Sequence, residues 1–120
     1  QYKAAFEAMA DKKNYPFYFH CSGGADRTGS FAYLILGLLG VPYKDIRADY
    51  ELTSFSKVGI RPADIFIDNN SFDEMNRIII EQYGDGSDNL QIAVENFLIN
   101  HFGVTKRSIC EIKEILTGDK

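Results

Sequence analysis

The residues best suited to chemistry lie in one short segment, His20 to Gly29, which reads HCSGGADRTG. Five residues separate Cys21 from Arg27, and two of the five are glycines. Glycines let successive backbone N–H groups turn toward one centre and form an anion nest. A helix that begins near Arg27 directs its positive end to the same place, and the guanidinium can form two parallel hydrogen bonds with a phosphate. The spacing therefore predicts a phosphate-binding loop.

The same local field acts on the thiol of Cys21. A thiol beside an arginine at a helix N-terminus loses its proton more readily, because the thiolate is stabilised there. The hydroxyl of Thr28 is placed to donate a hydrogen bond to that thiolate. We therefore predict that Cys21 attacks the phosphorus of a bound phosphate monoester and forms a cysteinyl phosphate.

The leaving alcohol of such a reaction needs a proton, and Asp26 is a candidate general acid. Asp26 also suits the N-cap of the following helix, so both roles stay open. His20 is expected to shape the loop through hydrogen bonds. The other loop residues are expected to contact the phosphate: Ser22, Gly23, Gly24, Ala25 and Thr28.

Two elements must position this loop. The aromatic stretch Tyr15 to His20 is typical of a strand, with Pro16 near its start, where a missing N–H is tolerated. A nearly all-apolar helix is predicted from Asp26 to Leu39, ended by Gly40. A strand, a loop and a buried helix in this order indicate an α/β fold.

The rest of the chain predicts helices joined by polar turns. Capping patterns begin helices at Ser71 with Glu74, at Asp88 with Gln91, and at Thr105. Residues 53 to 70 are expected to form a loop. The further helices predicted are Gln1 to Lys13, with Ala4, Ala5, Ala8 and Met9 on one face, Pro42 to Thr53, Ser71 to Gly84, Asp88 to His101, and Thr105 to Gly118.

A single strand cannot satisfy its own backbone N–H and C=O groups. We therefore expect residues 1–120 to be the C-terminal, mostly helical portion of one larger α/β domain. The missing strands would come from an upstream segment or from a partner chain.

Composition limits the number of domains and the classes of partner that this chain can have. The chain has 120 residues, 45% of them apolar, with nine Phe and seven Tyr, which suits at most one globular domain. A net charge of −4 argues against a nucleic-acid partner. The longest apolar run, Phe31 to Val41, is too short to span a bilayer. The two cysteines, Cys21 and Cys110, are not expected to pair, and both a cytoplasmic and a secreted location stay open.

The segment HCSGGADRTG resembles the protein-tyrosine-phosphatase superfamily, above all the bacterial branch whose loop reads HCxxGxDRTG. Two further stretches are similar to that branch, LGVPYKDIRADYELTS over residues 39–54 and HFGVTKRSICEIKEIL over residues 101–116. The resemblance covers most of the chain. It implies that this is the C-terminal portion of a phosphatase domain, with Cys21 as nucleophile, Arg27 as phosphate clamp and Asp26 as acid, and without a cofactor or metal.

The resemblance also bears on the substrate, a phosphorylated protein or a small phosphate ester, with protein phosphotyrosine as the leading candidate. Members that also act on phosphoinositides often carry Lys just before the Asp, where this chain has Ala25. That departure argues against a highly charged lipid substrate. A phosphoinositide or inositol-phosphate phosphatase and a non-catalytic phosphate-binding module remain the alternatives.

Several other polar residues are expected to be structural. Cys110 is predicted to be buried on an apolar helix face, and His101 to suit the negative end of a helix. Within the predicted loop, Lys57 and Arg61 are candidates to border the pocket and attract anions, whereas Asp64 and Asp68 are expected to be solvated turn residues. No His, Cys and Asp cluster has metal-ligand spacing.

Overall fold

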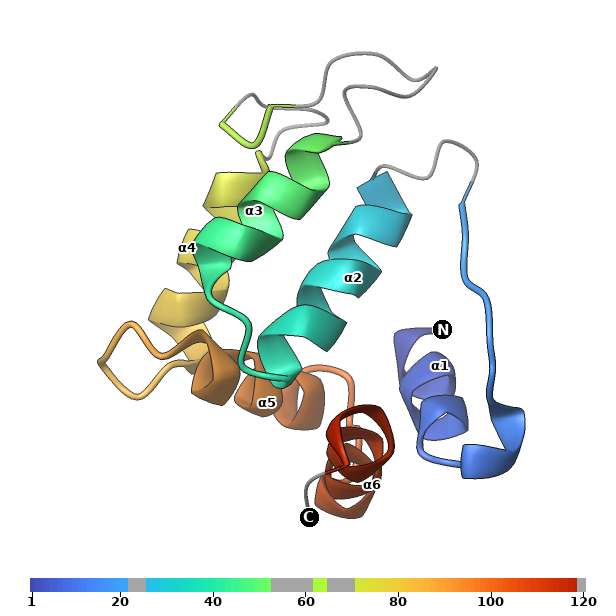
Figure 1. The fold of residues 1–120 in the computed structure, drawn as a ribbon. Coiled ribbons are helices and arrows are strands. Elements are labelled where there is room, and N and C mark those ends of the chain that lie inside the picture. The colour runs from blue at the N-terminus through green and yellow to red at the C-terminus, as the bar shows by residue number, and fades with distance from the viewer. Residues whose placement is uncertain (22–25, 53–61, 65–70, 119–120) are drawn as a thin grey trace.

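Helices form nearly all of the regular structure in the computed structural model, which describes residues 1–21, 26–52, 62–64 and 71–118 (Figure 1). Along the chain these are α1 Tyr2–Met9, the short 3-10 helix η1 Lys12–Asn14, α2 Asp26–Leu38, α3 Tyr43–Glu51, α4 Phe72–Tyr83, α5 Leu90–Asn100 and α6 Lys106–Thr117. Of the predicted loop over residues 53–70, only residues 62–64 lie inside the described ranges.

Side-chain caps begin three of the α-helices. The Ser71 hydroxyl accepts a hydrogen bond from the backbone N–H of Glu74, and Thr105 caps α6 in the same way, which confirms both predicted starts. The start of α5 was predicted one residue early. Asn89, rather than Asp88, is the N-cap, and its amide oxygen accepts from the N–H of Ile92 at 3.2 Å.

The apolar helix predicted after the loop is present as α2, and it lies at the centre of the helical core (Figure 1). It packs against α3 on one side and α5 on another. Gly37 permits the close approach to α5, because a Cβ at this position would lie 2.8 Å from the side chain of Val94. The Gln91 amide donates to the carbonyl of Leu38 at 2.8 Å and ties α5 to the end of α2. Gly40, with φ of 87°, then turns the chain out of the helix.

Helix α1 packs against α6, but only Ala5 and Met9 of the predicted face lie toward the core. Phe6 and Met9 are buried, whereas Ala4 and Ala8 are exposed. Burying the large Phe6 ring removes more apolar surface from water than burying alanines does, so the helix is rotated toward it. The Glu7 carboxylate accepts hydrogen bonds from the backbone N–H of Thr105 and the hydroxyl of Ser108, which fixes α1 to the start of α6.

The strand predicted at Tyr15 to His20 is not formed by the described residues, and the described fold is therefore all helical rather than α/β. Figure 1 shows this stretch as an extended trace at the edge of the molecule, and none of the described residues pairs with it as a strand. A strand requires backbone hydrogen bonds to a neighbour, which aromatic content alone does not provide. Phe17, Tyr18 and Phe19 are 37%, 84% and 37% exposed along it.

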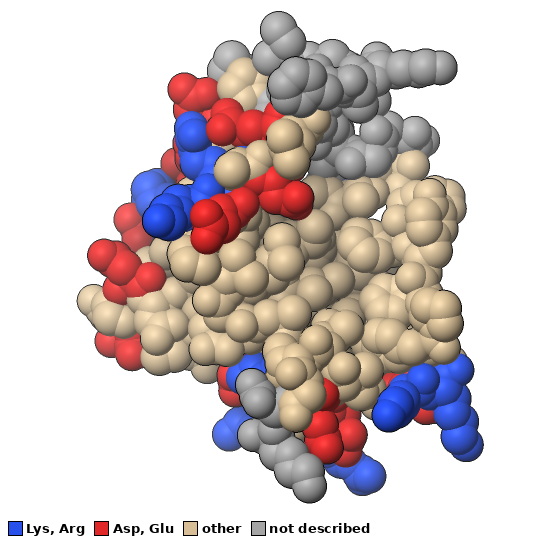
Figure 2. Space-filling view, viewed as in Figure 1, with Lys and Arg blue, Asp and Glu red and all other residues tan. Residues whose placement is uncertain are grey.

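Charge is unevenly distributed over the surface. In Figure 2, charged side chains gather over α3 and α4 and at the opposite end of the molecule, while the face between them is largely uncharged. None of the described helices has the length and hydropathy needed to cross a bilayer.

Candidate active site

Cys21 and Thr28 meet where the extended segment approaches the first turn of α2. The Thr28 hydroxyl oxygen lies 3.0 Å from the Cys21 sulfur and donates a hydrogen bond to it, as predicted. The thiol is half-buried. A hydrogen bond donated to sulfur favours the thiolate over the thiol, and the thiolate is the form in which a cysteine is nucleophilic.

A groove of about 310 Å³ opens at this thiol. Its polar lining includes Cys21, Arg27 and Thr28, and its apolar lining includes aromatic side chains from three segments. The aromatic lining consists of Tyr2, Phe19 and Phe31. The Phe19 and Phe31 rings meet edge to face, with centroids 4.8 Å apart. The groove thus combines a thiol and a guanidinium with aromatic rings set at steep angles to one another, an arrangement suited to an anionic group on an apolar body.

Tyr2 was not identified as a site residue from the sequence. Burial raises the pKa of its phenol, the charge of the nearby Cys21 raises it further, and Arg27 partly offsets both effects. Its ring stacks on Phe102, with centroids 4.9 Å apart. The sequence did contain an indication of this position: Tyr2 lies four residues before Phe6, and that spacing places both side chains on one face of a helix.

The remaining predicted loop residues are only partly described. Asp26 is the first residue of α2, and its side chain lies outside the described set, so its role as acid or cap stays a prediction. His20 is exposed and lines the groove. Outside the described residues lie Ser22, Gly23, Gly24 and Ala25 of the loop and, further along, Lys57, Arg61 and Asp68.

Among the residues expected to be structural, the prediction for Cys110 was wrong. Its thiol is exposed, because Ile109 and Ile112 occupy the buried face of α6 and the intervening Cys110 points elsewhere. Asp64 is exposed and His101 ends α5, as predicted, and the His101 ring stacks on Phe97 at 4.9 Å. No three His, Cys, Asp or Glu residues are grouped to hold a metal within the described ranges.

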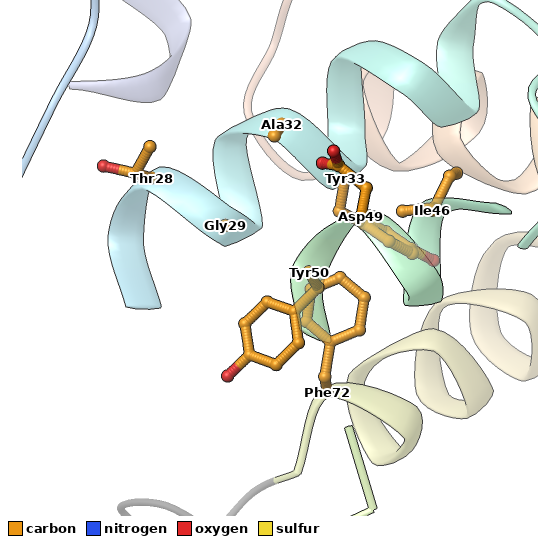
Figure 3. Close-up of a pocket in the computed structure, with 8 residues that line it drawn as sticks. All are labelled: Thr28, Gly29, Ala32, Tyr33, Ile46, Asp49, Tyr50 and Phe72. Atoms are coloured by element: carbon orange, nitrogen blue, oxygen red, sulfur yellow. The ribbon is translucent and has the colours of Figure 1, made fainter. Parts of the chain in front are cut away.

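Behind the first turn of α2 lies a second, smaller cavity of about 90 Å³, here called the rear pocket (Figure 3). It is enclosed by α2, α3 and the start of α4. Its lining residues are Thr28, Gly29, Ala32, Tyr33, Ile46, Asp49, Tyr50 and Phe72. Thr28 therefore lines both the groove and the rear pocket.

A polar network holds α3 against α4 beside this pocket. Arg47 donates to the Asp73 carboxylate at 3.0 Å, and the Tyr43 hydroxyl donates to it at 2.5 Å. Burial alone would raise the pKa of Asp73, but the hydrogen bonds from Arg47 and Tyr43 lower it below its ordinary value. Glu51 accepts from the backbone N–H of Ala63 at 3.1 Å, and the Ala63 carbonyl accepts from the N–H of Asp73 at 2.9 Å.

Comparisons with known proteins agree with the resemblance seen in the loop. A family model described as "Tyrosine phosphatase family" matches residues 1–118. A tyrosine-protein phosphatase from Nostoc commune is 39% identical over 54 residues, which are 45% of this chain and 18% of that protein. The match thus spans less than a fifth of the relative's length. No solved structure matches. Because the family model covers nearly the whole sequence, the chain belongs to the tyrosine phosphatase family.

Proposed function

We propose that this chain carries the catalytic centre of a phosphatase that hydrolyses phosphate monoesters through a cysteinyl phosphate on Cys21. The observation that carries the proposal is the 3.0 Å hydrogen bond from Thr28 to the Cys21 sulfur, in a groove that Arg27 also lines. A thiol that receives a hydrogen bond and borders an arginine is in the setting that favours a reactive thiolate.

In the first step, the Cys21 thiolate attacks phosphorus and the bond from phosphorus to the ester oxygen breaks. Asp26 gives its proton to that departing oxygen, and the alcohol leaves. In the second step, water attacks the cysteinyl phosphate, Asp26 takes a proton from the water, and inorganic phosphate and the thiolate are released. Arg27 and the backbone N–H groups of the loop would stabilise the charge on the phosphoryl oxygens in both steps.

The proposed substrate class is protein phosphotyrosine, with small aryl phosphates as simpler substrates. The aromatic wall of Tyr2, Phe19 and Phe31 supports an aryl group beside the phosphate, since aromatic rings pack favourably against one another. The relative's designation as a tyrosine-protein phosphatase points the same way. Phosphoinositides are the alternative, and Ala25 offers no side-chain cation for their additional phosphates.

We also propose that residues 15–20 form a strand of an α/β phosphatase domain, completed by an upstream segment or a partner chain. Their extended course and the exposure of Phe17 and Phe19 support the proposal, because both features suit a strand awaiting neighbours. Amide hydrogen exchange on the full-length protein tests it. Slow exchange across residues 17–20 is expected, and exchange at the rate of an open chain would contradict it.

The direct test of the chemistry uses the full-length protein with an aryl phosphate and a phosphotyrosine peptide. Cys21→Ser is expected to abolish turnover, while Cys110→Ser, which changes the other and exposed thiol, should leave it unchanged. Rapid acid quenching followed by peptide mass spectrometry should find phosphate on Cys21. Arg27→Lys should reduce kcat/KM by about 10³-fold, because an ammonium cannot reproduce the two-pronged guanidinium contact.

Two outcomes would overturn the proposal. One is turnover that survives Cys21→Ser, and the other is phosphate trapped on a different residue. Phosphate binding without any turnover would instead favour a non-catalytic phosphate-binding module.

A further inference from the structure

We propose that Tyr50 is a positioning residue for this reaction: its ring supports the first turn of α2 at Gly29 and thereby holds Thr28 against Cys21. The inference rests on the proposed function for its catalytic readout, while its second readout, the reactivity of the thiol, does not require turnover. Tyr50 lies on α3, outside the loop, and does not line the groove.

The contact between Tyr50 and Gly29 is unusually close. A Cβ added to Gly29 would lie 3.0 Å from Cδ2 and 3.1 Å from Cε2 of the Tyr50 ring. Gly29 is helical and does not have a positive φ, so the close approach of the ring, and not backbone conformation, favours glycine at this position. The Tyr50 ring thus lies directly against the backbone of α2, one residue after Thr28.

The Tyr50 ring is itself held from behind. It stacks on Phe72 with centroids 4.1 Å apart and planes 20° apart. Figure 3 shows the two rings next to each other. Phe72 opens α4 directly after the capping residue Ser71, and its ring also meets Tyr33 of α2 edge to face at 5.6 Å. Both Tyr50 and Phe72 are buried. Stacked, buried rings have few alternative rotamers, so the support is stiff.

Thr28 connects this support to the thiol. It lines the rear pocket with Tyr50, and in Figure 3 its hydroxyl points away from the Tyr50 and Phe72 rings. That hydroxyl makes the 3.0 Å hydrogen bond to Cys21, which does not line the rear pocket. Loss of the Tyr50 ring would enlarge the rear pocket and leave the first turn of α2 without backing. The Thr28 hydroxyl would then be held less firmly against the sulfur, and the thiolate would be less stabilised.

The test compares Tyr50→Phe and Tyr50→Leu in the full-length protein. Both variants also carry Cys110→Ser, which leaves Cys21 as the one cysteine within residues 1–120. The pH dependence of Cys21 alkylation by iodoacetamide is measured by peptide mass spectrometry, together with kcat/KM for an aryl phosphate. Tyr50→Phe retains the ring and should match the parent in both measurements. Tyr50→Leu should move the alkylation midpoint upward by at least about 0.5 pH unit and lower kcat/KM about tenfold.

A matched control separates positioning from loss of stability. Val94→Ala removes buried volume where α5 contacts Gly37, near the far end of the same helix α2. It should lower the free energy of unfolding but leave the alkylation midpoint where it was. An equal shift in Val94→Ala, or an unchanged midpoint in folded Tyr50→Leu, would overturn the inference.

Should Tyr50→Leu fail to fold, Gly29→Ala tests the same contact from the other side, because the added methyl must push the ring or the helix away. The pH midpoint of Cys21 alkylation is expected to rise in this variant as well. A folded Gly29→Ala protein with the same midpoint as the parent would contradict the proposal. If wild type alkylates normally and the variants shift as described, but no protein turns over phosphate, the proposed function fails while the positioning role of Tyr50 stands.

Discussion

The two sides of the thiol differ sharply in how well they are packed. On one side, α2 is enclosed by α3 and α5, with Leu38, Leu98 and Val94 fully or almost fully buried. On the other, the segment that ends at Cys21 runs along the edge with Phe17 and Phe19 more than a third exposed. The hydrogen bond from Thr28 to Cys21 joins the two regions. The proposed nucleophile therefore depends on Thr28, a residue of the packed helix, and on a segment that contacts α2 through Phe19 and Phe31 but pairs with none of the described residues as a strand.

The largest effect on stability is expected in the packed region. Leu98→Ala in α5 should lower the free energy of unfolding by about 3 kcal/mol, because the side chain is fully buried and leaves a cavity. Urea unfolding followed by circular dichroism measures the change. A loss below about 1 kcal/mol would show that the core rearranges and is less rigid than its packing indicates.

Asp26 lies where the two regions meet, and its substitution separates its two possible roles. If Asp26 is the general acid, Asp26→Asn should cost about 100-fold in kcat/KM with a poor leaving group and far less with an activated aryl phosphate. The alkaline limb of the pH–rate profile should also flatten. Equal losses with both substrates would favour the helix-capping role.

Removing the hydroxyl that joins the two regions should have a smaller effect. Thr28→Val keeps the shape of the side chain but cannot donate to the Cys21 sulfur, so the thiolate loses one stabilising contact. The acid limb of kcat/KM should move to higher pH, with activity below it reduced about tenfold. Thr28→Ser, which retains the hydroxyl, should preserve the profile, and a shift in both variants would contradict the assigned hydrogen bond.

The network between α3 and α4 predicts a modest dependence of stability on pH. Hydrogen bonds from Arg47 and Tyr43 lower the pKa of Asp73, so the stability contributed by this carboxylate is present above its ordinary pKa. It is lost as pH falls through the lowered value. Asp73→Asn should therefore make the free energy of unfolding less sensitive to acid, which unfolding experiments across that range can measure. If the free energy of unfolding of Asp73→Asn depends on pH as in the parent, Asp73 does not contribute to the acid sensitivity of this protein.

The smallest effect is expected in the extended segment. Phe17→Ser should change the stability of residues 1–120, studied alone, by less than about 0.5 kcal/mol, since the ring is already partly exposed. In the full-length protein the same substitution should cost more, because the proposed neighbouring strands would bury the ring. Equal small changes in both proteins would argue against a completed sheet at this edge.

Local sequence patterns anticipated much of this structure. The caps at Ser71 and Thr105, the apolar helix after the loop and the glycine at position 40 are correct because each depends on residues within a few positions of one another. The contact of Thr28 with Cys21 was also predictable, because the two residues lie only seven positions apart. The start of α5 was displaced by one residue, since Asp88 and Asn89 are both good capping residues.

The tertiary structure alone decided features that depend on distant partners. The rotation of α1 that places Tyr2 at the groove, and the exposure of Cys110, reflect which face of each helix meets its neighbour. The support of Gly29 by Tyr50 joins residues 21 positions apart, and the state of residues 15–20 depends on whether another strand lies beside them. The sequence by itself determined the starts of α4 and α6, the apolar helix α2 and the choice of Cys21 as the candidate nucleophile, because these follow from local hydrogen bonding and residue spacing. Packing between helices determined what surrounds the thiol, because the burial of apolar surface is settled only when separate elements meet.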